Sequence, residues 1–240
     1  MRPLLFWVCV VFSLQIAQAY ALPPQKLVLE YDMIYNGTAV ALVVNRLEHD
    51  HKNYSISEEV KGKGLYALIR SGAARRLARG MVGGDGLKPT EFRDRRGDAA
   101  ENVARFDWVK SSLIQGQDGR GETQAMPAAN HSQPLSDRLS FLWDFAFRSP
   151  EFTRKGKEVN AILSDGRGLS TFRYLVTGTE TLQTQAGAME TIKLVKQKDP
   201  GDDRGTEIWL ATEHFYAPVR ILVIEKDGTR LDQLVTRIGA

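Results

Sequence analysis

Cysteine is almost absent from this sequence of 240 residues, since Cys9 is the only one. It lies inside the apolar run from Leu4 to Leu14, and Trp7-Val8 stand where a lipoprotein signal needs small residues. We therefore expect no lipid anchor. Beyond this run the chain has no cysteine, which excludes disulfides, thiolate metal ligands and a cysteine nucleophile. The folded part of the chain must then be stabilised by a hydrophobic core.

The motifs of several enzyme classes are also missing. The sequence has no Gly-x-Ser-x-Gly nucleophile elbow and no glycine-rich phosphate loop. Adjacent acids such as Glu58-Glu59 point to opposite faces of a strand, so they do not face one substrate. His49 and His51 lie on an expected turn without a third ligand of suitable geometry, and zinc needs three or four. We expect no enzymatic activity, no metal and no cofactor, and we interpret both histidines as solvated turn residues.

Long apolar runs are missing apart from the one at the N-terminus. Arg2 gives that end a positive charge, and Ala17-Gln18-Ala19 after the run fits a signal-peptide cleavage site. The run is too short and too soon followed by polar residues for a membrane span. We expect residues 1–19 to be a cleaved signal peptide and residues 20–240 to form a single β-rich domain. The mature protein is then periplasmic and has no transmembrane segment.

A large excess of either charge is missing as well. The chain has 32 basic and 29 acidic residues, a balance that argues against a dedicated nucleic-acid binder. The distribution is uneven, however, because the stretch from Lys61 to Arg79 holds six bases and no acid.

This basic stretch has two interpretations. Its arginines, Arg70, Arg75, Arg76 and Arg79, contact an anionic surface such as lipid head groups or acidic glycans. Alternatively, they protect an exposed edge strand from aggregation. We prefer the edge strand, because it needs no partner.

Alternating apolar and polar residues predict strands along most of the chain. Asn36-Gly37 and Asp227-Gly228 are hairpin signals, because these residues tolerate the positive φ of a tight type I′ turn. Residues 206–210 are expected to pair with residues 219–225. About a dozen or more short strands at regular spacing indicate an antiparallel sandwich, barrel or strongly curled sheet.

One stretch, Ser136 to Phe147, predicts a helix. Ser136 is a suitable N-cap, and Ser149-Pro150 ends the segment. Leu139, Leu142, Trp143 and Ala146 form one apolar stripe, and Phe141 and Phe145 form a second apolar face. Such a helix must be wrapped by the sheet, or must share its second face with a ligand, a partner or lipid.

Two acids near aromatic residues are candidates for structural ion pairs. Asp107 alternates with Phe106 and Trp108, and Asp137 lies in the first turn of the expected helix, near its positive dipole end. We expect each of them to pair with an arginine from another strand, such as Arg93 or Arg220.

Several short pieces of the sequence, taken in order, resemble a known family. They are Gly86-Leu87-Lys88-Pro89 with Phe92, Phe106-Asp107-Trp108, Ser136-Asp137-Arg138-Leu139-Ser140, Ile208-Trp209-Leu210, and Pro218-Val219-Arg220-Ile221 before Asp227-Gly228. Together they resemble the bacterial domain-of-unknown-function family 3108 (DUF3108) of exported proteins. The resemblance implies an antiparallel sheet curled around one central helix, similar to the open half-barrels of periplasmic lipoprotein carriers. It implies no reaction.

Our leading hypothesis is a non-enzymatic envelope protein that binds an acyl chain, a lipid or an apolar partner segment in a groove of the curled sheet. The residues that we expect at the groove are Phe106, Trp108, Phe141, Trp143, Phe145 and Trp209. One alternative is a protein-interaction scaffold with a closed core. Another is an envelope hydrolase without a recognisable motif.

Overall fold

A computed structural model of the chain describes residues 22–64, 67, 74–129, 132–198 and 201–239. These residues form one sheet of 15 strands and the helix α2 (Arg138–Asp144). The strands are β1 (Lys26–Tyr35), β2 (Thr38–His49), β3 (Asn53–Gly62), β4 (Ala74–Gly83), β5 (Gly86–Arg96), β6 (Asn102–Asp107), β7 (Ser112–Gln117), β8 (Thr123–Ala125), β9 (Leu135–Asp137), β10 (Glu158–Ser164), β11 (Leu169–Thr184), β12 (Gly187–Lys196), β13 (Gly205–Ala211), β14 (Ala217–Ile224) and β15 (Arg230–Gly239). The protein is therefore mainly β, as predicted.

The sheet consists of two meanders that meet at the chain's first and last strands. Strands β1 to β8 follow one another outward on one side, and β15 back to β9 do so on the other, with β1 paired to β15 between them. Short turns explain this order. Asn36 and Gly37 both have positive φ, 45° and 88°, as the predicted tight hairpin requires. The predicted pairing of residues 206–210 with residues 219–225 is also confirmed, because β13 pairs with β14.

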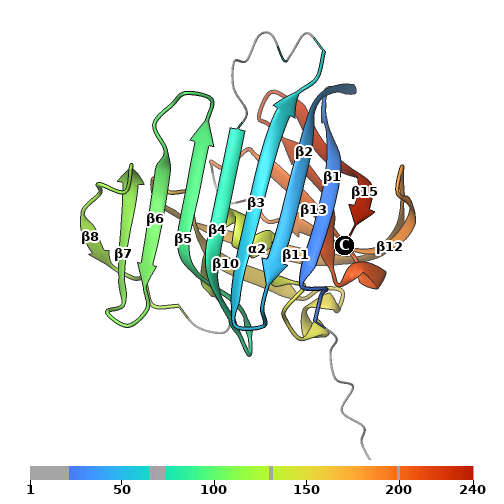
Figure 1. Ribbon diagram of the computed structural model, residues 1–240. Coiled ribbons are helices and arrows are strands. Elements are labelled where there is room, and N and C mark those ends of the chain that lie inside the picture. The colour runs from blue at the N-terminus through green and yellow to red at the C-terminus, as the bar shows by residue number, and fades with distance from the viewer. Residues whose placement is uncertain (1–21, 65–66, 68–73, 130–131, 199–200, 240) are drawn as a thin grey trace, which may run out of the picture.

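The sheet curls but does not close. Strands β8 and β9 stand at the two ends of the hydrogen-bonded order, and β9 pairs in parallel with β10. Strand β9 nevertheless packs against β5 of the other meander. On the same side, the Ser164 hydroxyl of β10 donates to Gln115 Oε1 of β7 at 2.8 Å. In Figure 1, β1 to β8 form the front layer, and β10 and β11 run behind them.

Helix α2 belongs to the connection between the two meanders and is shorter than predicted. It packs against β4 and β5 of one meander and β9, β10 and β14 of the other. The expected N-cap Ser136 is wrong, because Leu135–Asp137 is strand β9 and Asp137 caps the helix. The helix ends at Asp144, and a 3-10 turn (Pro150–Thr153) follows.

The buried apolar residues form two clusters that both include residues of the α2 segment. One contains Leu139 and Trp143 together with side chains from the β1–β7 meander and from β13 to β15. The other contains Phe141 and Phe145 with side chains from β10 to β13. The second apolar face of the segment is therefore covered by the protein's own strands, with Phe141 2% and Phe145 0% exposed.

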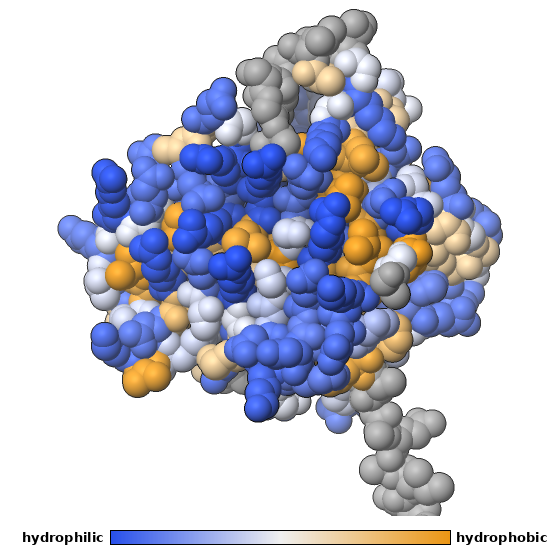
Figure 2. Space-filling model, in the orientation of Figure 1, coloured by the Kyte–Doolittle hydropathy of each residue, from blue (hydrophilic) through white to orange (hydrophobic). Residues whose placement is uncertain are grey.

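The edge-strand interpretation of the basic stretch is wrong. Strand β4, which carries Arg75, Arg76 and Arg79, lies between β3 and β5. Because the sheet is a single curled layer, an interior strand also has one face in solvent, and outward-facing charges do not identify an edge. Figure 2 shows this solvent face, where hydrophilic side chains predominate between smaller hydrophobic areas. None of the described helices is both long enough and apolar enough to cross a membrane.

Candidate functional site

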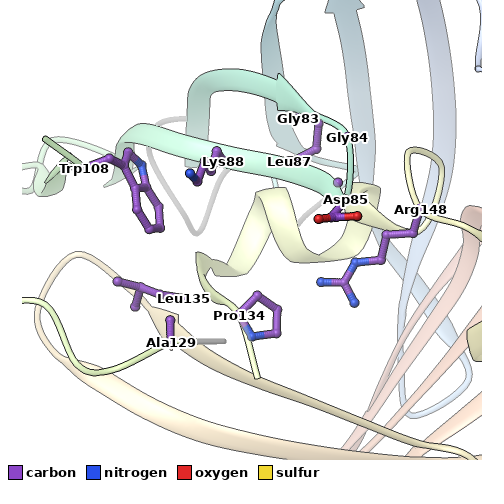
Figure 3. A pocket seen from close by; sticks show the side chains of 11 residues that line it. Gly83, Gly84, Asp85, Leu87, Lys88, Trp108, Ala129, Pro134, Leu135 and Arg148 are labelled. Carbon is purple, nitrogen blue, oxygen red and sulfur yellow. The ribbon is translucent and has the colours of Figure 1, made fainter. Parts of the chain in front are cut away.

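A cavity of about 420 Å³ lies where the β4–β5 turn meets the segment that leads into β9. This volume is in the range of pockets that bind small ligands, about 300–1,000 Å³. Residues 83–88 form one side of it, and the other described lining residues are Trp108, Ala129, Pro134, Leu135 and Arg148 (Figure 3). The lining thus comes from segments that are far apart in the sequence.

Trp108 forms an aromatic wall of the cavity and is held from several sides. Its indole Nε1 donates to the Pro89 carbonyl at 2.6 Å. Its ring stacks on Phe106, with centroids 6.2 Å apart, and Lys88 Nζ lies 5.1 Å from its centroid. The Asp107 carboxylate accepts the backbone N–H groups of Val109 and Lys110, which fixes the turn after β6. The indole is therefore positioned before any ligand binds.

The opposite side of the cavity is organised by Asp144, the last residue of α2. Its Oδ1 accepts the Leu87 backbone N–H at 2.6 Å, and its Oδ2 lies 2.5 Å from Arg148 Nε. Burial raises the pKa of Asp144, and the positive charge of Arg148 opposes that rise. Asp144 is 4% exposed, so it holds Leu87 and Arg148 from behind the cavity wall.

Gly86 makes this arrangement sterically possible. Its φ is +120°, a conformation that residues with a side chain rarely adopt. A Cβ at this position would lie 2.2 Å from Asp144 Oδ1. Only glycine allows the start of β5 to approach the Asp144 carboxylate this closely.

The structure does not bring the six predicted groove residues together on one surface. Trp108 lines the cavity, and Phe106 lies beside it with 5% exposure. Trp143 is buried in the first core cluster, and Phe141 and Phe145 are buried in the second. Contact of these residues with a ligand stays a prediction.

Trp209, the sixth groove residue, is enclosed by polar partners. It is 2% exposed. Lys193 Nζ and Arg220 Cζ lie 4.6 and 4.5 Å from its ring centroid, and its indole N–H donates to Glu180. Its surroundings are therefore set by the protein's own side chains.

The four basic candidates do not form one surface either. Arg70 lies outside the described residues. The Arg75 side chain is 70% exposed beside Glu59, and Arg79 is also exposed. Arg76 points to the inner face, where it pairs with Glu58 at 2.5 Å and Asp94 at 3.4 Å. Its neighbours on that face of β4 are the buried residues Ala78 and Gly80.

Arg76 belongs to a row of polar residues that crosses the inner face of five strands. Asn45 is paired with Glu58, Glu58 with Arg76, Arg76 with Asp94, and Asp94 with Asn102. Asn45, Glu58 and Asp94 are 0%, 3% and 5% exposed, and both amide atoms of Asn45 lack a hydrogen-bond partner among the described residues. The row lies at the opposite end of the strands from the cavity.

The expected acid–arginine pairs are wrong. Asp107 caps its own turn and pairs with Lys110, whereas Arg220 pairs with Asp232 of β15. Arg93 pairs with Glu91 and Glu101. Acids two positions away along the same strand, or diagonally opposite on or beside the next strand, are closer partners of these arginines than the acids singled out from the sequence.

Among the described residues Asp137 forms no ion pair with an arginine, and it is instead fully buried as the N-cap of α2. Its carboxylate accepts the N–H groups of Leu139 and Ser140 and the Ser140 hydroxyl. The same hydroxyl lies 2.7 Å from the Tyr54 hydroxyl. Burial raises the pKa of Asp137 to about 6.

The two histidines are not both solvated, contrary to the prediction. His49 is 7% exposed, its Nε2 lies 3.0 Å from the Pro23 carbonyl oxygen, and its ring packs edge-on against Phe147. His51 is exposed on the turn. No cluster of three or more potential metal-ligating residues occurs in the part of the chain that the structure describes.

Sequence reasoning missed Lys88, Asp144 and Arg148 as site residues. A lone acid at position 144, inside an otherwise apolar run, was the available signal, because a charge is rarely buried without a partner. Its partner could not be read from the sequence, since Leu87 lies 57 positions away.

A family model described as "Protein of unknown function (DUF3108)" matches residues 30–235. The chain belongs to the DUF3108 family. In this DUF3108 protein two of the pieces that carried the resemblance, Gly86–Pro89 and Phe106–Trp108, lie at the cavity, and a third begins at Ser136, directly after Leu135 of the cavity lining. No curated protein matches the chain.

Among the solved structures that resemble this DUF3108 protein are proteins from Brucella abortus and Parabacteroides distasonis. One is a β-barrel-like protein of the DUF1849 family from Brucella abortus, with a TM-score of 0.56 and 6% identity over 91% of this chain and 98% of that chain. The other is described as a putative lipoprotein from Parabacteroides distasonis, with a TM-score of 0.40 and 8% identity over 92% of this chain and 98% of that chain. The similarity to the Brucella protein shows that the two chains share a β-barrel-like fold. At 6% identity it shows nothing about function.

Proposed function

We propose that this DUF3108 protein is a non-enzymatic, periplasmic envelope protein that binds an apolar or amphiphilic ligand in the cavity beside Trp108. The observation that carries the proposal is the cavity itself, which has an aromatic and aliphatic wall and a few polar groups on its other side. This combination is typical of ligand pockets. Export by the leader, residues 1–19, belongs to the proposal and lies outside the described residues.

The ligand site that we propose lies away from the apolar faces of the helix. Phe141 and Phe145 are buried against β10 to β13, so a ligand at that face would have to displace packed side chains. The cavity, by contrast, is already formed and is walled by Trp108, Pro134 and Leu135. We therefore assign binding to the Trp108 side of the molecule and treat the lipid-carrier analogy as part of the proposal.

Native mass spectrometry of the protein purified from its own periplasm tests this function. We expect a bound mass that is lost when Ala129, an exposed residue of the lining, is replaced by tryptophan to fill the cavity. The matched control is Ala125→Trp on the exposed strand β8, which should retain the bound mass. An apo mass for the wild type, with no change in tryptophan fluorescence on titration with fatty acid or phospholipid, would overturn the proposal.

A second candidate function is an interaction scaffold with a closed core. The observation that favours it is the complete burial of the Phe141 and Phe145 face by the protein's own strands. It predicts capture of a partner protein by crosslinking, and loss of capture in the double variant Arg75→Glu, Arg79→Glu, which changes only outward-facing residues of β4. Capture that survives this double variant would exclude the outer face of β4 as the contact surface.

A further inference from the structure

Two cationic side chains from distant segments border the cavity. Lys88 comes from the start of β5, and Arg148 follows α2. In Figure 3 Lys88 lies beside Trp108 on one side of the cavity, and the Arg148 guanidinium points toward Pro134 from the other side. Asp85 is the acidic residue of the described lining, and Asp144 adds a second carboxylate beside Arg148 behind the wall.

The two cations differ in their neighbours, because Lys88 lies over an uncharged ring, whereas Arg148 is ion-paired with the Asp144 carboxylate behind the cavity wall. Lys88 Nζ lies over the Trp108 ring at 5.1 Å, an interaction that leaves its N–H groups available to an anion. Asp144 Oδ2 lies 2.5 Å from Arg148 Nε on the buried side, so the ion pair keeps the guanidinium close to the cavity wall. A guanidinium has further N–H groups for a second acceptor, and its fork matches the two oxygens of a carboxylate or phosphate.

The remaining wall is apolar and lies next to these cations. Trp108, Pro134 and Leu135 offer ring and aliphatic surface along one side of the cavity. A ligand that uses both parts must have a compact acidic group joined to a hydrocarbon chain.

We propose that the ligand of this cavity is a single-chain anionic amphiphile, whose acidic group binds between Lys88 and Arg148 and whose chain lies against Trp108, Pro134 and Leu135. The inference rests on the proposed function and specifies its ligand class. A carboxylate head, as in a fatty acid, and a phosphate head, as in a single-chain phospholipid, share the chemistry that these side chains recognise. Asp144 is a positioning residue, because it orients Arg148 without bordering the cavity.

Binding of three probes with the same twelve-carbon chain tests the ligand class. Dodecanoate, dodecyl phosphate and dodecanol are titrated into the mature protein and followed by calorimetry. We expect at least one of the two anions to bind about tenfold more tightly than dodecanol, and the stronger anion identifies the head group. The advantage over dodecanol, with both probes measured in the same variant, should disappear in Lys88→Gln, because this substitution removes the positive charge beside Trp108.

Controls separate this inference from the proposed function. Lys110→Gln changes an exposed lysine outside the lining and should keep the anion preference. Arg148→Gln should also abolish the preference for anions. If the Arg148→Gln variant does not fold because Asp144 has lost its partner, Lys88→Gln still tests the anion inference. Equal binding of dodecanol and both anions overturns the anion inference and leaves the apolar pocket intact. No binding of any probe to the wild type overturns both.

Discussion

The Asp144 Oδ1 atom lies 2.6 Å from the backbone nitrogen of Leu87, although the two residues are 57 positions apart. This hydrogen bond attaches the last residue of α2 to the start of strand β5. Because the other Asp144 oxygen pairs with Arg148, one buried carboxylate holds two segments that line the cavity. Helix position and cavity shape are therefore coupled through Asp144.

Replacement of Gly86 by alanine should disturb this contact directly. The added Cβ would lie 2.2 Å from Asp144 Oδ1, and the φ of +120° is unfavourable for any residue with a side chain. We expect the free energy of unfolding to fall by at least about 2 kcal/mol, measured by urea denaturation.

The neighbouring Gly84 provides the control for that experiment. A Cβ at Gly84 meets no atom within 4 Å, and its φ is not in the positive region. Gly84→Ala should therefore change stability by no more than about 0.5 kcal/mol. Similar losses in both variants would show that the β4–β5 turn, rather than the Asp144 contact, is sensitive to substitution.

The sequence predicted local features better than distant ones. The hairpin at Asn36-Gly37 is encoded by two adjacent residues, so it could be read directly. The N-cap was misassigned because Ser136 and Asp137 are both good caps, and the choice depends on the pairing of Leu135–Asp137 with β10. That pairing is a long-range contact without a local signal.

The candidate site was predicted only in part for the same reason. Trp108 was among the predicted groove residues and lies in the cavity lining, but its contact with a ligand stays a prediction. Lys88 and Arg148 looked like ordinary surface charges, because only the curl of the sheet and the path of the chain into β9 bring them to one cavity. Sequence periodicity shows which face a residue occupies, but not which residues meet across a curved sheet.

Truncation of the two faces of the α2 segment should cost similar amounts of stability. Trp143 and Phe141 are 0% and 2% exposed, and each is packed in a different core cluster. Trp143→Ala and Phe141→Ala should each lower the free energy of unfolding by about 3–5 kcal/mol, the range for large buried aromatic residues. Val109→Ala, at a 96% exposed position, is the control and should be nearly neutral. A much smaller loss for Phe141→Ala would indicate that its face is open to a ligand.

Adjacent arginines of β4 should respond differently to the same substitution. Arg76→Leu leaves Glu58 and Asp94 buried with less positive charge beside them, which should cost about 2–3 kcal/mol. This is below the loss for a fully buried pair, because the Arg76 side chain is 36% exposed. Arg75→Leu, on the outer face at 70% exposure, should change stability by less than about 0.5 kcal/mol. Equal effects, measured by thermal unfolding, would contradict the inward placement of Arg76.

Asp137 should make the protein less stable as the pH rises from about 4 to above 6. Burial raises its pKa from 3.8 to about 6, so between these values the folded protein binds more protons than the unfolded chain. The contribution of Asp137 is complete below about pH 4 and is lost as the pH passes through 6. Its size is on the order of 3 kcal/mol, given about 1.4 kcal/mol for each unit of pKa difference.

Asp137→Asn isolates this contribution, because asparagine still caps a helix but does not titrate. Asp144, whose pKa is also raised by burial, affects stability in the same direction in both proteins. Acids with lowered pKa values, such as Glu59, stabilise both proteins less as the pH falls toward 4. The informative quantity is therefore the difference in unfolding free energy between wild type and variant, measured by urea denaturation from pH 4 to 8. We expect the wild type to lose its advantage over Asp137→Asn as the pH rises. A difference that does not change with pH would mean that Asp137 is ionised throughout this range and that its hydrogen bonds from Leu139 and Ser140 outweigh its burial.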